Sequence, residues 1–528
     1  MQQQRRIFLL RGARLASLGA ALGAAGASVA APAPRAQAYP FSLGVASGSP
    51  LPDSVILWTR ILADPLNAQS MPPVAVPVRW EVAHDQAFTR IVAAGTATAS
   101  PALAHSVHVD VKGLAPARWY WYRFMLGDAV SPAGRTRTAP APGTMPGLLK
   151  LAVASCQHWE FGAYAAHRHI AAAHPDLVVF LGDYIYEWGP YQLRHPASAQ
   201  RVNESYSLPD YRARYAQYKS DPDLQAAHLA APWIVTWDDH EVANDYARDR
   251  DELLTPDFAA RRAAAYQAFY EHMPLRLATP RSGAFGDVRI YQRYDWGQLA
   301  RLHVLDDRQY RAVQTCAPKG RGGSSSVTRA CKALADPARS MLGAQQEAWL
   351  AEGFASSKAR WNIVAQQTPM AQSSQLPLTT PGGGRFWNDG WDGYPAARAR
   401  LFDALVASRA ANPVILSGDV HTFYATDLLA DFGRPVSARN PVIATELCGT
   451  SVTSSSRGQA RTQQFVDMNP HIKYGRSDKR GFMLMEITPE STSTVFVGLD
   501  NVRDPNSAAA RLASFGVANG RPGARRTG

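Results

Sequence analysis

Four short stretches of the sequence end an apolar run on side chains that can bind metal ions. These side chains are a thiol, a phenol, imidazoles and carboxylates, and the runs before them are typical of buried parallel strands. Ligands bind at the carboxyl ends of strands in open α/β sheets, so we expect the four strands to bring these groups to one edge of one sheet. The stretches are residues 148–156, 177–186, 234–241 and 414–421.

One group of candidate ligands combines a thiol with a phenol. Cys156 ends the strand before that of Asp183, and its thiolate is a soft ligand that favours iron over calcium. Tyr186 follows Asp183 by three residues, and iron(III) can hold it as a phenolate because a bound cation reverses the usual pKa preference. The alternatives are that Cys156 is a buried core residue and that Asp183 caps a helix. As ligands, these residues predict an iron site, with Asp183 able to bridge to a second ion.

A second group is rich in oxygen atoms. Asp239, Asn244 and Asp419 carry carboxylate and amide oxygens that suit a hard divalent ion. His240 and His421 add imidazoles that can bind a metal or donate a proton. Two adjacent cations hold a hydroxide and the oxygens of a phosphate ester, and they stabilise an in-line displacement. The two groups together therefore predict a phosphoesterase site.

The rest of the sequence supplies the elements that position these side chains. Residues 148–528 alternate strand-like runs with amphipathic helices, which predicts an α/β domain. Residues 39–139 contain short strand-like runs between turns, which predicts a small all-β domain of the immunoglobulin or fibronectin type. The expected helices are 163–174, 211–219, 258–272, 345–356 and 396–408, and the expected strands include 55–60, 76–82, 105–111, 118–124, 288–294, 301–306, 361–365 and 481–488.

The first 38 residues have the features of a twin-arginine signal peptide. Arg5 and Arg6 precede a weakly apolar stretch, and residues 36–38 form a small-x-small cleavage site. Gly, Ser and Pro interrupt the apolar stretch, so we expect no stable membrane span. We expect a periplasmic or secreted protein that the twin-arginine machinery exports after folding, which suits a protein that binds a cofactor first.

Charge and cysteine content add two expectations. The net charge of +12 comes from scattered arginines without a long basic run, so we expect no specific nucleic-acid partner and a disordered tail at residues 521–526. Cys316 and Cys331 flank a loop rich in Gly and Ser, and a disulfide between them is expected in an oxidising compartment. Cys156 and Cys448 then remain as candidate free thiols.

Several motifs, which follow one another along the chain, resemble those of the PhoD-type alkaline phosphatases. That family lies in the calcineurin-like metallophosphoesterase superfamily and also includes phosphodiesterase and phospholipase D activities. The resemblance implies a four-layer αββα catalytic domain, preceded by a small all-β domain, that holds iron(III) with one or two calcium ions. The motifs are residues 182–187, 237–244, 305–310 and 417–421, with residues 41–50 and 57–60 similar to the family's N-terminal domain.

The resemblance also implies roles for individual residues in a secreted, metal-dependent phosphoesterase of monoesters, diesters or both, acting through a metal-activated hydroxide. His240 would contact phosphate or protonate the leaving oxygen. Arg308 would pair with phosphate through its planar guanidinium, or else lie in a structural ion pair. By similarity, iron would be bound by Cys156, Asp183 and Tyr186, and the metals would share Asp183, Asp239, Asn244, Asp419 and His421.

Three other functions fit parts of the sequence. A phospholipase D that acts on phospholipid diesters would use the same metal site. His471, Lys473 and Asp478 fit the motif of the metal-free phospholipase D superfamily, but that mechanism needs two copies and the sequence has one. A non-catalytic polyanion-binding protein would have lost a metal ligand, and every expected position is filled.

Residues 387–394 form an aromatic loop interrupted by glycine. We expect this loop at the rim of the cleft, with core packing as the alternative.

Overall fold

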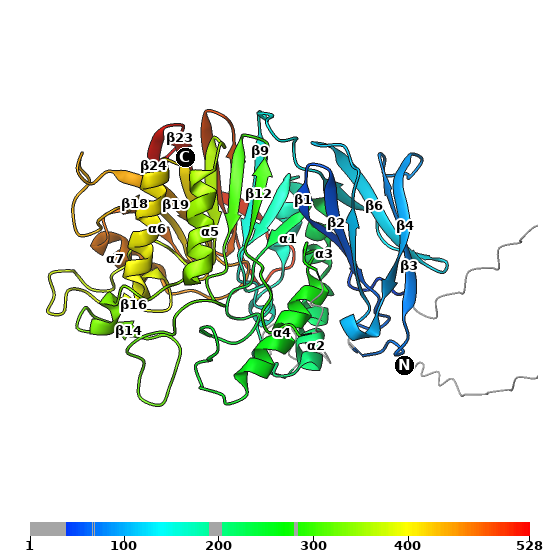
Figure 1. Ribbon diagram of the computed structural model, residues 1–528, viewed down its shortest axis with the longest axis horizontal. Helices are drawn as coiled ribbons and strands as arrows, with labels where there is room; N and C mark the ends of the chain where they lie inside the picture. Colours follow the sequence, from blue (N-terminus) through cyan, green and yellow to red (C-terminus); the bar gives the residue numbers. More distant parts are fainter. Residues whose placement is uncertain (1–38, 66, 68, 190–202, 279–283) are drawn as a thin grey trace, which may run out of the picture.

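The computed structural model describes residues 39–528 apart from residues 66, 68, 190–202 and 279–283 (Figure 1). The predicted signal peptide, residues 1–38, lies outside the described residues. No helix in the described part of the chain is long and apolar enough to cross a membrane.

The largest sheet of the described residues has ten strands and joins the N-terminal region to the rest of the chain. β1 pairs in parallel with β11, where Gly48 lies opposite Trp233. A Cβ on Gly48 would lie 2.6 Å from the carbonyl oxygen of Trp233, so glycine permits this close pairing. The strand order is β24 (Arg521–Arg526), β23 (Ala509–Ala518), β22 (Ser491–Leu499), β21 (Gly481–Ile487), β9 (Leu149–Ala154), β10 (Leu177–Phe180), β11 (Trp233–Val235), β1 (Val45–Leu51), β2 (Ser54–Arg60) and β5 (Ser106–Val111).

The N-terminal region is all-β, as expected, and a second sheet completes it. Val55 and Leu57 of β2 pack against Val78 and Tyr120 in one apolar cluster, so two sheets enclose the core of this region. These strands lie at one end of the molecule, drawn in blue (Figure 1). The second sheet contains β4 (Ile91–Ala99), β3 (Val76–Ala83), β6 (Trp119–Leu126) and β7 (Ala129–Val130), with β8 (Gly134–Arg137) paired to β6.

Another sheet, of seven strands within the described residues, carries the last of the four ligand-bearing stretches. Its order is β12 (Gln292–Trp296), β13 (Ala300–Val304), β15 (Trp361–Ala365), β17 (Pro413–Ser417), β19 (Val442–Cys448), β18 (Phe423–Leu429) and β20 (Ile472–Arg476). Leu151 and Val179 of the ten-stranded sheet share an apolar cluster with Val414 and Leu416 of β17. The two sheets therefore pack against each other. A short hairpin, β14 (Ser326–Val327) with β16 (Phe386–Trp387), lies outside both.

Helices cover the outer faces of the two large sheets. α1 to α4 contribute to the apolar cluster that contains Phe180 and Trp233, and α5 and α6 to the cluster that contains Val364 and Ile415. The five predicted helices are present, whereas α3 and α7 were not predicted. The helices are α1 (Ala165–Ala172), α2 (Leu208–Lys219), α3 (Pro222–Ala230), α4 (Phe258–His272), α5 (Gly343–Ala355), α6 (Pro395–Ser408) and α7 (Gln459–Met468).

Two sequence-based expectations are wrong. The four ligand-bearing strands do not share one sheet: β9, β10 and β11 lie in the ten-stranded sheet and β17 in the seven-stranded sheet. Hydrophobic runs reveal buried strands but not which sheet each strand joins. Residues 521–526 are not a disordered tail but form β24, which pairs with β23 through Phe515 and Arg526. Backbone pairing with β23 orders a segment whose side chains carry little apolar pattern.

Candidate metal centre

Four of the predicted ligands lie in sharp turns just after strands. Cys156 and Asp183 follow β9 and β10, and Asp419 and His421 follow β17. Their φ angles are 61°, 56°, 63° and 55°, a left-handed conformation that residues other than glycine seldom adopt. Such outliers persist where the surrounding structure enforces them, and they cluster at functional sites. The turns aim four side chains from two sheets at one place.

Gly182 makes the turn before Asp183 possible. Its φ is +103°, and a Cβ at this position would lie 2.5 Å from the Cβ of Asp238. No other residue fits this backbone and this contact. Gly182 therefore brings the end of β10 against the segment that follows β11.

The ligand atoms form three overlapping groups, each within 4.8 Å. Asp183 belongs to two of them and Asp239 to two, so these two carboxylates connect adjacent candidate ion positions. His421 groups with the thiol of Cys156 rather than with the carboxylates of Asp238 and Asp419. The groups are Cys156 with Asp183 and His421, Asp183 with Asp239 and His240, and Asp238 with Asp239 and Asp419.

Tyr186 lies with the first of these groups. Its Oη donates a hydrogen bond to Oδ2 of Asp183 at 2.8 Å and lies 3.3 Å from Nε2 of His421. The hydroxyl of Ser454 donates to the same Oη at 2.7 Å. The phenol of Tyr186 and the ligand atoms of Asp183 and His421 therefore face one another.

The donor set of this centre fits bound cations. Burial raises the pKa of Cys156 and of Tyr186, and the carboxylate of Asp183 raises both further. Burial likewise raises the pKa of Asp183 and of Asp419, because charged groups are costly in a desolvated site. Within the described residues, the buried Oδ1 of Asp239 accepts no hydrogen bond. A cation would offset the crowded negative charge and take up these lone pairs.

Glu187 positions two of the predicted residues. Its Oε2 accepts a hydrogen bond from Nδ1 of His240 at 2.7 Å, and its Oε1 accepts one from the backbone N–H of Asn244 at 2.6 Å. Burial disfavours the imidazolium, but Glu187, Asp239 and Asp183 together raise the pKa of His240 well above its usual value. Asn244 and His240 both line a cavity next to the centre, and Nδ2 of Asn244 donates to Glu252 at 3.1 Å.

Arg308 lies behind the centre, in the ion-pair arrangement that the sequence left as its alternative. Its side chain is fully buried, and it does not line the cavity. Nε pairs with Asp238, and Nη1 lies 2.7 Å from Oδ2 of Asp389. Nη2 lies 3.4 Å from Oδ1 of Asp239 and 3.9 Å from Oδ1 of Asp419. Arg308 therefore holds carboxylates of the centre rather than reaching into the cavity.

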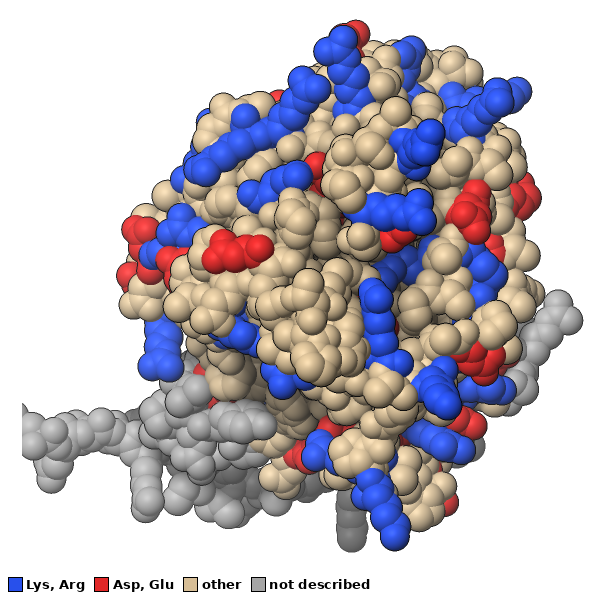
Figure 2. Space-filling model, turned by 90° about the vertical axis from the view of Figure 1, so that its left-hand side faces the viewer, with Lys and Arg blue, Asp and Glu red and all other residues tan. Residues whose placement is uncertain are grey.

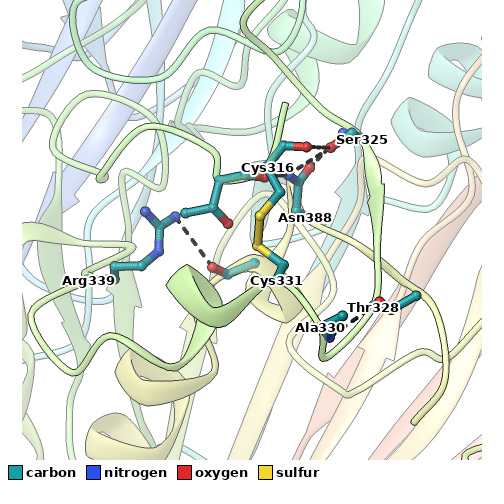
Figure 3. Close-up of a disulfide and its surroundings, with 9 residues drawn as sticks. Cys316, Ser325, Thr328, Ala330, Cys331, Arg339 and Asn388 are labelled. Carbon is teal, nitrogen blue, oxygen red and sulfur yellow. Dashed lines mark hydrogen bonds between the residues drawn. A yellow bond between two sulfur atoms is a disulfide. The ribbon is translucent and has the colours of Figure 1, made fainter. Parts of the chain in front are cut away.

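The predicted disulfide is present and braces the loop behind Arg308. Cys316 and Cys331 are bonded, with Cα atoms 6.3 Å apart (Figure 3). Within the loop that they close, the backbone N–H of Ser325 donates to Oδ1 of Asn388 at 2.6 Å. The next residue, Asp389, binds both Arg308 and Arg311. The disulfide loop thus supports the segment that anchors Arg308. Cys156 and Cys448 are free and buried, as expected.

A cavity of about 630 Å³ opens on part of the centre, and the residues of the centre that line it are Asp183, Asp239, His240, Asn244, Asp419 and His421. The aromatic loop lines this cavity with the exposed Trp387 and the buried Trp391, and Trp391 also packs in the apolar cluster of α5 and α6, which was the alternative. The single phospholipase D-like motif does not assemble a site here: Nε2 of His471 binds the carbonyl of Gln372 at 2.7 Å. Neither His471 nor Lys473 lines the cavity, whereas the intervening Ile472 does.

Sequence reasoning missed four residues that build the centre. Asp238 is one of its candidate ligands. Glu241 accepts hydrogen bonds from the backbone N–H groups of Asp183, Tyr184 and Asp238. Asp238, Glu241 and Glu187 all lie inside motifs visible in the sequence, so their position beside predicted ligands was a usable signal. Ser454 had no such signal, because its role depends on a distant loop that folds over Tyr186.

Known proteins resemble this chain over nearly its full length. The family model described as PhoD-like phosphatase matches residues 151–496, and the model for its N-terminal domain matches residues 26–140. Alkaline phosphatase D of Bacillus subtilis (strain 168) is 43% identical over 522 residues, covering 97% of this chain and 87% of the relative. A solved structure described as "Structure of PhoD" superposes with a TM-score of 0.86 at 42% identity, covering 94% of both chains.

Proposed function

Because the chain belongs to the PhoD-like phosphatase family, we propose that it hydrolyses phosphate esters as an alkaline phosphatase at the centre described above. The observation that carries this proposal is the set of three ligand groups joined by Asp183 and Asp239, two residues that line the cavity. A four-layer αββα arrangement would hold the site in place. Apolar clusters between the ten-stranded and seven-stranded sheets, and between each of these sheets and its helices, support this arrangement.

The donor chemistry supports iron(III) on one side and calcium on the other. Cys156, Tyr186 and His421, with a carboxylate oxygen of Asp183, would hold iron. Asp239, Asn244 and Asp419, with Asp183 and Asp238 close by, would hold one or two calcium ions through oxygen atoms. Bound there, the cations would polarise the phosphate ester and activate water.

The chain's own residues supply the proton and the positioning. Glu187 accepts the Nδ1 proton of His240, a residue that lines the cavity, so Nε2 is the ring nitrogen that would bind or protonate a substrate oxygen. We assign His240 the role of contacting phosphate or donating a proton to the leaving oxygen. Arg308 fixes Asp238 and Asp239 from behind.

Export through the twin-arginine pathway is part of the same proposal, because that pathway carries folded proteins and so suits a protein that binds its metals before export. Arg5 and Arg6 support it. Replacing both with lysine should leave the protein in the cytoplasm, measured by cell fractionation. Periplasmic accumulation of that variant would contradict this route.

The catalytic proposal is tested by the bridging carboxylate. Asp183→Asn should lower kcat for 4-nitrophenyl phosphate by at least about 10³-fold while the circular dichroism spectrum stays unchanged, because the amide is uncharged and bridges two cations poorly. The matched control Asp403→Asn, on the exposed face of α6, should keep full activity. Normal turnover by Asp183→Asn would remove this residue from the reaction. Rates on the bis-ester and on phosphatidylcholine, measured beside the monoester, rank the phosphodiesterase and phospholipase D alternatives.

A further inference from the structure

The cavity extends beyond the metal centre to a second region between α7, β18 and β20. Phe465 of α7, Tyr424 of β18 and Ile472 of β20 line it, and all three are buried. Trp391 and Val420 are further apolar residues that line the cavity. An apolar wall of this kind does not bind phosphate, so it offers contact to the organic group of an ester rather than to its phosphoryl group.

Two arginines stand at this end of the cavity. The guanidinium carbons of Arg457 and Arg461 lie 4.7 and 4.9 Å from the ring centroid of Phe465, and both side chains line the cavity. Within the residues that the structure describes, neither arginine forms an ion pair, and Arg461 donates to Gln464 at 2.9 Å. Figure 2 looks at this end of the molecule, where Lys and Arg side chains outnumber Asp and Glu.

The acidic groups in the same region already have partners. Glu446 accepts hydrogen bonds from the backbone N–H groups of Met370 and Ala371 and from the hydroxyl of Ser417. Asp392 pairs with Arg398 at 2.7 Å. The charge that this region offers to a ligand is therefore positive.

One short segment links the two arginines to the metal centre. Ser454 binds Tyr186, and the carbonyl of Ser455 accepts a hydrogen bond from Nδ1 of His421 at 2.6 Å. Arg457 follows Ser454 by three residues, so their Cα atoms lie no more than about 11 Å apart. The two arginines therefore follow directly on a segment that binds two residues of the centre.

We propose that this region is a leaving-group subsite that selects phosphate esters whose planar apolar group carries a second anionic group. The planar group packs on Ile472 and Tyr424, and the anion pairs with Arg457 and Arg461, which Phe465 holds at this end of the cavity. The inference rests on the proposed phosphatase function and adds the substrate class to it.

The test uses two substrates of nearly equal shape, 6-carboxy-2-naphthyl phosphate and its 6-carboxamide. Wild-type enzyme should prefer the carboxylate by about tenfold in kcat/KM, and salt should weaken the preference. Arg457→Gln with Arg461→Gln should bring the ratio close to one, whereas the matched surface control Arg434→Gln should leave it unchanged. A ratio that stays the same in the double variant, or no preference in the wild type, would overturn the subsite.

Binding separates failure of the subsite from failure of the catalytic proposal. Calorimetric titration of Asp183→Asn with both esters should give about tenfold tighter binding of the carboxylate, and this difference should vanish when the two arginine changes are added. If the wild type hydrolyses neither ester, the phosphatase function fails. The ratio of the two esters' dissociation constants then still tests whether the subsite binds the carboxylate. Equal affinity for both esters would refute it.

Discussion

At the scale of single residues, the centre depends on one buried cation. Arg308 is fully buried and contacts four carboxylates: Asp238, Asp389, Asp239 and Asp419. Such an arginine compensates charge that the fold has removed from water, and its planar fork fixes the orientation of its partners. Its effect on phosphate therefore passes through the carboxylates.

Changes at Arg308 should separate positioning from direct substrate contact. Arg308→Met leaves buried carboxylates unpaired and should lower stability by about 3–5 kcal/mol, measured as a fall in Tm. Arg308→Lys keeps the charge and loses the fork, so it should fold, bind less metal and lower kcat about 10- to 100-fold with little change in KM. Arg434→Lys, in an exposed pair, is the control. A raised KM with normal metal content would indicate direct phosphate contact instead.

At the scale of elements, the last turn of α2 joins the ten-stranded sheet through a buried lysine. Nζ of Lys219 lies 4.2 Å from the ring centroid of Trp58 in β2 and 5.3 Å from that of Tyr184. Within the described residues it has no hydrogen-bond partner. Burial lowers the pKa of Lys219 from 10.5 to about 7. The contact between helix and sheet is therefore sensitive to pH.

The sign of that sensitivity follows from proton binding. Between pH 7 and 10.5 the unfolded chain binds a proton at Lys219 that the native chain has released, so this residue's cost to stability falls as pH rises through that range. Lys219→Met should therefore raise the free energy of unfolding at pH 6 by on the order of a few kcal/mol, measured as a higher Tm. This gain should shrink toward pH 10. Calorimetry of both proteins from pH 6 to 10 measures the difference. A gain in Tm that does not vary with pH would contradict the lowered pKa of Lys219.

At the scale of the whole molecule, the sequence predicts which strands are buried and which residues follow them, because hydrophobic runs and motifs are local. It predicts α4 to the residue, and it predicts that ligands follow the strands β9, β10 and β17, although not where each strand ends. It does not reveal that β17 lies in a second sheet or that β1 continues the first, since both depend on pairing between distant segments. Ser454 was missed and Arg308 left open for the same reason: their partners lie far away in the sequence.

The metal content of the active enzyme tests the central claim most directly. Protein purified from the periplasm should be titrated with a chelator while iron, calcium and zinc are counted by elemental analysis and hydrolysis of 4-nitrophenyl phosphate is followed. Iron together with calcium should be present at the start, and activity should fall in proportion to their loss. Full activity in metal-free protein would contradict the metal centre, and zinc as the only metal would contradict the assignment of Cys156 and Tyr186 to iron.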